Sequence, residues 1–377
     1  MAGSAARREL SGTPARVIDL ASRRDDRELR ALLRRSVIPG AVRIAFTREP
    51  DYFAAQALAG AEDVTVVSRH DGRLTGIARC SVNRLYRNGS VQRVGYLAEL
   101  RVLPGTPASP RLLRDGYAVI GDALASARVG AFFTSIAVDN ERARRVLEQG
   151  KRFGLPRYRP LASLVTLIAP VTRGARRRGD QPVGACTEEE QAALQALLRE
   201  QARGAHLTLA WDTAQWRALA GHGITPADFV AVREGGRIVA AAAVWDQRPF
   251  RQTVIDGYEG ALRLGRPLAN AVQALRGLPH LPQPGSVLAQ GAVLGASVTE
   301  SAAWPPLWRA LQARAATLGL SWLAVAFDTR DPQLAALRRL LRAREYRTTL
   351  YEVTWGGGPS PTDAWDDRLF RPEVGLL

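Results

Sequence analysis

Glu99 is the carboxylate whose surroundings best suit acid–base chemistry. It stands in the apolar stretch of residues 94–103, and removal from water raises the pKa of a carboxyl group toward the range of a general base. A base is needed if an amine attacks a carbonyl carbon, because an ammonium ion has no lone pair. Tyr96 and Tyr117 are the candidate general acids, with core packing as their alternative role. The alternative role of Glu99 is an ion pair with Arg101 or another nearby arginine.

An anion site is predicted just after this stretch, where we expect a helix over residues 111–128. Ser109 and Pro110 form a good N-cap and first-turn pair. The start of a helix presents unpaired main-chain N–H groups and the positive end of its dipole, which suits a pyrophosphate. Arg111 and Arg114 lie in the first turn and could add charge-assisted hydrogen bonds to phosphate oxygens. The alternative interpretation is that both arginines are simply solvated.

Helix and strand patterns alternate around these residues. The spacing of leucines predicts a helix over residues 25–35, and a second short helix is expected over residues 51–58. A strand hairpin comes next, followed by the apolar strand 94–103 and the helix that begins after Ser109. A strand at 131–138, a helix at 141–149 and a closing strand at 161–169 complete the pattern. The predicted class is α+β, with a strand–loop–helix–strand unit at its centre.

The same order of elements recurs in the second half of the chain. The hairpin 66–76 resembles 230–240, the strand 97–103 resembles 288–294, and 135–140 resembles 324–329. Chance similarity between segments rich in Ala, Arg and Leu is the alternative explanation. The second copy has about 25 extra residues, which we place in a loop around residues 265–284, where proline and glycine concentrate.

The length of 377 residues is enough for two domains that each bury a core. We predict a first domain at residues 15–170, a linker rich in Arg and Gly at 171–182, a second domain at 183–356 and a tail at 357–377. Whether the tryptophans at positions 211, 216 and 245 line a pocket or fill the second core stays open.

This order of elements resembles that of the GCN5-related N-acetyltransferase superfamily. Residues 97–104 resemble its fourth strand, which ends in a Val-x-Pro element, here Val-Leu-Pro at 102–104. Val-Asp-Asn at 138–140, followed by Ala143 and Leu147, resembles its Asn-x-x-Ala segment, and residues 48–53 resemble a segment near the start of some members. The resemblance covers residues 16–169 well and 183–355 more faintly. It implies two tandem domains, each a mixed, mostly antiparallel twisted sheet flanked by helices.

The resemblance also implies an acetyl-CoA-dependent N-acyltransferase in which an amine attacks the thioester directly. The first domain would be the active one, and the acceptor would be the amine of a small molecule or a peptide. The pantetheine arm would bind the main chain of the fourth strand by strand-like hydrogen bonds. With Glu99 and Tyr117 as the catalytic candidates, the predicted cofactor-binding residues are Leu100, Arg101, Val102, Ser109, Arg111, Leu112, Arg114 and Asn140. A plain helix N-cap is the alternative role of Asn140.

The chain departs from the family pattern at several places. The family's phosphate loop carries Arg/Gln-x-x-Gly-x-Gly/Ala, whereas residues 105–113 lack the two spaced glycines that let a backbone approach phosphate. The tyrosine that often protonates the leaving thiolate is absent, and Leu147 stands at its place. The second copy departs further, with Trp-Pro-Pro at 304–306 opening its helix, and we expect it to have a structural or substrate-shaping role. The alternative function is therefore a non-catalytic module that binds acyl-CoA or another ligand.

Composition narrows the range of partners. The two cysteines lie far apart and the four histidines lack ligand spacing, so we expect neither a disulfide framework nor a metal cofactor. A net charge of +16 suits a polyanion, but nucleic acid is the last-ranked partner because aromatic residues do not interleave with the arginine cluster at 173–178. The apolar runs are too short to cross a bilayer, and residues 1–20 lack the pattern of a secretory signal. We expect a cytoplasmic protein without a membrane partner.

Overall fold

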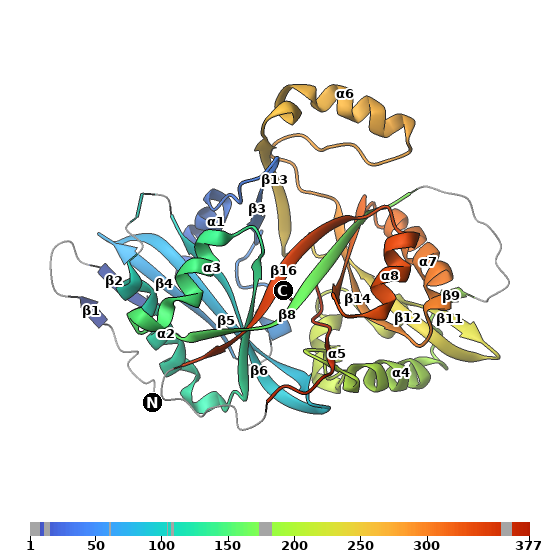
Figure 1. Cartoon of the computed structure of the whole chain (residues 1–377), viewed down its shortest axis with the longest axis horizontal. Helices are drawn as coiled ribbons and strands as arrows, with labels where there is room; N and C mark the ends of the chain where they lie inside the picture. Colours follow the sequence, from blue (N-terminus) through green and yellow to red (C-terminus); the bar gives the residue numbers. More distant parts are fainter. Residues whose placement is uncertain are drawn as a thin grey trace.

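The computed structural model describes residues 8–10, 16–59, 62–103, 105–106, 109–172, 183–355 and 364–377. Figure 1 shows two halves, each built of helices and strands, that lie side by side and are connected by strands crossing the middle of the molecule. The predicted α+β class is confirmed. The arginine cluster at 173–178 lies outside the described residues. Among the described residues, no helix is both long and apolar enough to span a bilayer.

The first half follows the predicted order with one exception. Leucines at positions 29, 32 and 33 are buried on one face of α1 (Asp26–Arg35), as their spacing predicts. The second short helix, predicted at 51–58, is present only in its last part, as the 3-10 helix η2, because Asp51 accepts a hydrogen bond from the main-chain N–H of Phe53 and holds a turn before it. The other elements are β1 (Arg8–Leu10), β2 (Arg16–Leu20), η1 (Arg23–Asp25), β3 (Val42–Thr47), η2 (Gln56–Ala59), β4 (Asp63–His70), β5 (Arg73–Arg87), β6 (Ser90–Val102), α2 (Pro110–Leu124), η3 (Ala125–Ala127), β7 (Ala131–Ala137), α3 (Glu141–Glu148), η4 (Gly150–Phe153) and β8 (Arg157–Pro170).

The second half repeats the central order of hairpin, strand, helix, strand and helix. The extra residues of this copy contain a helix, α6 (Ala261–Leu275), so the prediction of a plain loop at 265–284 is wrong in its first part. The other elements are β9 (Val183–Ala185), α4 (Gln191–Arg203), β10 (Ala205–His206), α5 (Thr213–Ala220), η5 (Pro226–Asp228), β11 (Phe229–Glu234), β12 (Arg237–Trp245), β13 (Gln252–Tyr258), β14 (Gln290–Val298), η6 (Ser301–Ala303), α7 (Trp304–Thr317), β15 (Trp322–Asp328), α8 (Pro332–Leu340), β16 (Arg344–Thr354) and β17 (Leu369–Phe370).

One sheet runs through both halves. Among the described strands its order is β1-β2-β4-β5-β6-β7-β16-β8-β15-β14-β12-β11-β9. β8 closes the first half by sequence but pairs antiparallel with β15, whereas β16, from the end of the second half, pairs with β7. Each half therefore completes its sheet with a strand of the other half. The domain limits 15–170 and 183–356 stay a proposal, because they divide the chain by sequence and not by hydrogen bonding.

The structure corrects the register of the repeat. Each copy has a β-bulge in its central strand, at Glu99 (φ 54°) in β6 and at Gly295 (φ 62°) in β14. The bulges align Glu99 with Gly295, whereas the sequence comparison aligned Glu99 with Gln290. That comparison matched the identical Leu-Ala pairs at positions 97 and 288, but the hydrogen-bond register is fixed by where the extra residue of the bulge stands.

Different helices cover the two faces of the first half's sheet. α2 packs with Ile120 on the face that carries Val66, and α1 packs with Tyr52 on the face that carries Val67. Residues 66 and 67 are neighbours on β4, so their side chains point to opposite faces. The tryptophans at 211 and 245 are buried, and Trp216 packs on the first of them, so this group fills the core where the halves meet.

Candidate active site

β6 and β7 run side by side for three residue pairs and then part. Residues 94–96 of β6 pair with residues 131–133 of β7. The hydroxyl of Thr134 then donates to the carbonyl of Leu97 (2.7 Å). Beyond that point β6 continues along β5, and β7 continues along β16. The main chain of β6 from Leu100 to Val102 therefore borders an opening between the two strands.

The bulge directs the Glu99 side chain to the face of the sheet opposite α2. There Arg48 Nε donates to Glu99 Oε1 (2.7 Å), and the hydroxyl of Tyr52 donates to Oε2 (2.8 Å). Gln252 of β13 holds the neighbouring backbone, since it accepts from the Glu49 N–H (2.9 Å) and donates to the Glu49 carbonyl (2.8 Å). The Arg48 side chain is only 3% exposed. Both halves thus fix one buried ion pair at the bulge.

The prediction of a raised pKa at Glu99 is wrong. Burial by itself would raise the pKa of this carboxyl, but the guanidinium groups of Arg48 and Arg79 and the Tyr52 hydroxyl outweigh burial and hold the pKa at about 2. The carboxylate is therefore ionised at neutral pH and is a weak base. Of the two roles considered, the ion pair is the one the structure contains, and its partner is Arg48 in place of Arg101.

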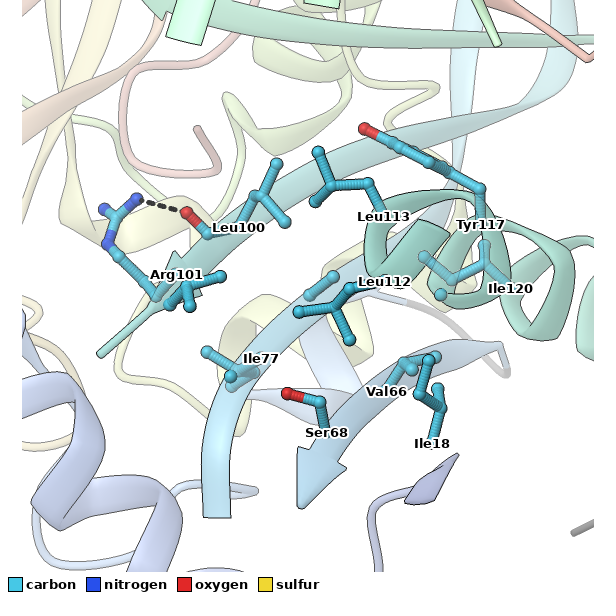
Figure 2. A pocket seen from close by; sticks show the side chains of 14 residues that line it. Ile18, Val66, Ser68, Ile77, Leu100, Arg101, Leu112, Leu113, Tyr117 and Ile120 are labelled. Atoms are coloured by element: carbon cyan, nitrogen blue, oxygen red, sulfur yellow. Dashed lines mark hydrogen bonds between the residues drawn. The ribbon is translucent and has the colours of Figure 1, made fainter. Parts of the chain in front are cut away.

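An apolar pocket lies between α2 and the sheet, on the face away from Glu99 (Figure 2). Its volume is about 410 Å³, including the part open to solvent. Leu100 and Val102 line it from β6, and Leu112, Gly116 and Tyr117 line it from α2. Figure 2 shows the Arg101 guanidinium turned away from it, toward the carbonyl of Leu100 (3.2 Å). The pocket suits an apolar chain, and it brings together five of the residues predicted for the site.

The two candidate catalytic residues are not brought together. The hydroxyl of Tyr117 bonds to that of Tyr158 beneath α2, and burial raises the pKa of Tyr117 to about 12. Glu99 lies on the opposite face with Tyr52. Tyr96, the other candidate acid, stacks on the Phe133 ring with centroids 4.9 Å apart, and burial raises its pKa to about 12 as well.

A second pocket lies where the two halves meet, and we call it the junction pocket. Its volume is about 330 Å³, including open space, and its lining includes Arg79 of β5 and Arg251 of the second half. Asp63 holds Arg79 by two hydrogen bonds of 2.7 Å. Arg251 donates to the main-chain oxygens of Gly375 (2.9 Å) and Leu377 (3.0 Å). Burial, followed by the charges of Arg48 and Arg79, lowers the pKa of Arg251 to about 10.

The start of α2 keeps few free donors for an anion. Ser109 Oγ accepts from the Leu112 N–H (3.2 Å), and the Ser109 carbonyl accepts from the Leu113 N–H (3.3 Å). Pro110 has no N–H to offer. The main chain and exposed side chain of Arg111 are the donors that remain in this turn. Residues 104, 107 and 108 of the preceding loop lie outside the described residues.

Asn140 and Arg114 make local contacts. The Asn140 side chain accepts from the Ala143 N–H (3.2 Å), which is the helix-capping role considered as its alternative. Arg114 pairs with the adjacent, buried Asp115 (3.0 Å) and is half exposed. To bind a cofactor atom, the Asn140 or Arg114 side chain would first have to release its present partner in the chain.

The matching opening in the second half is filled by the chain itself. The main-chain N–H of Gly295, at the bulge, donates to Glu373 Oε2 (3.1 Å). The carbonyl of Val298 accepts from Gln333 Nε2 (3.1 Å), and Gln333 Oε1 accepts from the indole N–H of Trp304 (2.9 Å). Trp304 is buried. The main-chain groups of β6 border an opening in the first half. The groups at the corresponding positions of β14 in the second half are hydrogen-bonded to side chains.

Sequence reasoning missed four residues of this site. Arg48 and Tyr52 belong to the segment 48–53 that resembled other family members, so that segment could have pointed to them. Arg79 and Arg251 stand in no motif, and only the pairing of β5 with β6 and of β13 with β3 brings them to Glu99. Within the described residues, no group of three or more His, Cys, Asp or Glu side chains is placed to hold a metal ion.

Comparison with known proteins gives a likeness in structure only. No protein-family model matches the sequence, and no curated protein matches it. Saccharomyces cerevisiae N-myristoyltransferase with bound myristoyl-CoA superposes with a TM-score of 0.61 at 10% identity, over 98% of this chain and 92% of that one. A GCN5-related N-acetyltransferase from Sphaerobacter thermophilus gives a TM-score of 0.53 at 13% identity, over 92% of this chain and 98% of that one.

A third similar structure is a GCN5-related glucosamine N-acetyltransferase region of a fungal multi-domain β-N-acetylglucosaminidase. Its TM-score is 0.55 at 13% identity, and the match covers 91% of this chain but only 38% of the fungal one. At such identities the likeness establishes the fold alone. The fold is like that of these N-myristoyltransferase and N-acetyltransferase structures.

Proposed function

We propose that this chain, a tandem of two GCN5-related N-acetyltransferase folds, is an acyl-CoA-dependent N-acyltransferase whose first half holds the donor. One observation carries the proposal. β6 and β7 part beside an apolar pocket in the first half, whereas side chains of the protein occupy the matching groups in the second. We propose acetyl-CoA as the donor, with its pantetheine arm along the main chain of residues 100–102 and its diphosphate beside Arg111.

We propose that the two pockets receive the two reactants from opposite faces of the sheet. The apolar pocket reaches the opening at Leu100 from the face covered by α2, and we assign that face to the donor. The junction pocket lies on the other face and is lined by Arg79 and Arg251, whose charges act on Glu99, and we assign it to the acceptor, an amine of a small molecule or peptide. The amine nitrogen attacks the thioester carbon, the C–S bond breaks, the thiolate leaves on the donor side, and the proton that the nitrogen loses on forming the amide ends on the thiolate.

The cations around the junction pocket reduce the need for a strong base. The surroundings that lower the pKa of Arg251 to about 10 would also lower the pKa of a bound ammonium group. We propose that the amine loses its proton to solvent and binds in the neutral form. Glu99 then acts as a positioning residue that holds Arg48 and Tyr52 beside the bulge. Tyr117, whose pKa is about 12, is a weaker acid than a thiol, and its proposed role is to line the acyl pocket.

Calorimetric titration with acetyl-CoA and longer acyl-CoA thioesters tests donor binding. Arg111→Gln, at the start of α2, is expected to weaken binding about tenfold, because a charge-assisted hydrogen bond to phosphate is lost. Arg309→Gln is the matched control, since Arg309 is an exposed arginine near the start of the equivalent helix α7. The absence of both binding heat and thermal stabilisation at millimolar acyl-CoA, with every chain length tested, would defeat the proposal.

Release of free thiol with a panel of amines tests transfer. The lower limb of the pH profile of kcat/KM should follow the pKa of each amine, and not one pKa shared by all of them. A shared limb would show that the enzyme supplies the base, against the role given to Glu99.

A non-catalytic acyl-CoA-binding module is the second candidate. The capped start of α2 favours it, because Ser109 already satisfies donors that a diphosphate would need. Binding of acyl-CoA without thiol release in the presence of any amine on the panel would select this candidate.

A further inference from the structure

Two polar side chains of the helix α6, Arg266 and Asn270, face inward, and four of its apolar side chains face outward. Arg266 donates to the carbonyls of Leu281 (3.4 Å) and Pro282 (3.3 Å) in the segment that returns along the helix. Asn270 accepts from the Leu281 N–H (2.7 Å) and donates to its carbonyl (3.2 Å). An ordinary surface helix does the reverse, because its apolar stripe packs on the core.

The outward face of α6 is apolar along its whole length. Leu264 is 88% exposed, Leu268 72%, Val272 40% and Leu275 89%. These positions recur at helical spacing and form one stripe. Between residues 261 and 275 the other exposed side chains are alanines, Pro267 and Arg263. Scattered exposed leucines need no explanation, but a continuous stripe of them indicates an interaction surface.

The charges around α6 indicate what covers this stripe. Residues 260–299 contain no Asp or Glu, while Arg263 and Arg276 stand exposed near the two ends of the helix. A second copy of the chain would bring like charges face to face, with each copy carrying a net charge of +16. An anionic lipid surface provides both an apolar layer for the leucines and phosphates for the arginines.

The position of α6 allows such contact. Figure 1 shows the helix at the top of the view, standing clear of both halves beyond the pair of strands β3 and β13. None of its residues is buried. The helix is therefore accessible to a flat surface without any rearrangement of the sheet.

We infer that α6 is an interfacial anchor that binds the chain to anionic lipid membranes. Its leucine face lies among the acyl chains at the level of the headgroups, and Arg263 and Arg276 contact lipid phosphates. The expectation of no membrane partner concerns segments that cross a bilayer, and an interfacial helix does not cross one. The sequence predicts a loop at 265–284, and that prediction leaves out a helix that could lie on a membrane surface.

Vesicle flotation with the full chain tests the inference. Vesicles of phosphatidylcholine with one quarter phosphatidylglycerol are expected to bind the chain about thirtyfold more tightly than phosphatidylcholine alone, since two arginines act near the charged surface. Leu264→Gln combined with Leu268→Gln should lower binding roughly tenfold or more, because two leucine side chains no longer leave water. Leu20→Gln combined with Leu340→Gln is the control, since these leucines are exposed elsewhere, on β2 and α8.

Four results would overturn the inference. The first is no flotation with the anionic vesicles, and the second is equal binding of the α6 variant and the control. The third is a dimer in light scattering that the α6 variant dissociates, which would make a second copy the occupant of the stripe. Equal binding to neutral and anionic vesicles would overturn the choice of an anionic surface. None of these measurements depends on acyl transfer, so the inference and the proposed function fail independently.

Discussion

Glu373→Gln should make the protein more stable at alkaline pH and leave its stability nearly unchanged in acid. Burial raises the pKa of Glu373 to about 7 from an ordinary value of 4.5, and the Gly295 N–H is the one contact that opposes the shift. An acid with a raised pKa holds its proton more tightly in the folded chain than in the unfolded chain. Its contribution to stability is complete below pH 4.5 and is lost as pH rises through 7.

The size of the effect follows from the shift. A pKa of about 7 in place of 4.5 corresponds to about 3.5 kcal/mol, at about 1.4 kcal/mol per unit. The side chain is partly exposed, so about 2 kcal/mol is expected after screening by solvent. For a chain of 377 residues, this amounts to an increase in the melting temperature of about 3 °C at pH 8.5. Glutamine can still accept the Gly295 hydrogen bond, so the change isolates the charge.

Thermal unfolding of the wild type and the variant between pH 5 and pH 8.5 is the measurement. The difference between their melting temperatures should widen as pH rises. Glu188→Gln, an exposed residue at the start of the second half, is the control and should give a constant difference. A constant difference for Glu373→Gln as well would refute the argument that Glu373 keeps its proton against the second bulge.

Three further substitutions test other local contacts. Ser109→Ala should lower the free energy of unfolding by about 1 kcal/mol in urea titration, because the Leu112 N–H loses its cap. Gly116→Ala should raise it by about 0.5–1 kcal/mol in the same assay, since a Cβ there meets no atom within 4 Å and alanine favours the helix. Glu190→Gln should lower the melting temperature near neutral pH. Arg233 and the Thr187 N–H hold the pKa of Glu190 at about 2, so this difference should shrink as pH falls from 4.5 toward 2.

The element order was predictable from the sequence, but the pairing of the closing strands was not. Leucine spacing in α1 and the Ser-Pro pair before α2 specify local structure, which the structure contains. β8 and β16 are both long strands at the end of a repeat, and each could pair within its own half. The exchange between halves is a long-range choice that no local pattern encodes.

The place of Glu99 was predictable from the sequence, but the direction of its pKa shift was not. The sequence located Glu99 correctly on an apolar strand, yet its pKa falls because Arg48, Arg79 and Arg251 come from distant segments. Desolvation can be inferred from neighbours in sequence, whereas the electrostatic contribution depends on neighbours in space. In the same way, the sequence predicts Ser109 as a helix cap. The number of main-chain N–H donors left free for an anion depends on contacts in space.

The exchange of closing strands explains why a filled second half can persist beside an open first half. β7 forms one wall of the opening, and its outer edge is completed by β16 of the second half. Without β16 that edge would present unpaired main-chain groups next to the opening, which is costly when buried and prone to aggregate when exposed. Arg251 and Gln252 also come from the second half. Arg251 interacts electrostatically with Glu99, and Gln252 hydrogen-bonds to the main chain of Glu49. The second half therefore shapes the first half's site through the shared sheet, even though Glu373, Gln333 and Trp304 occupy its own opening.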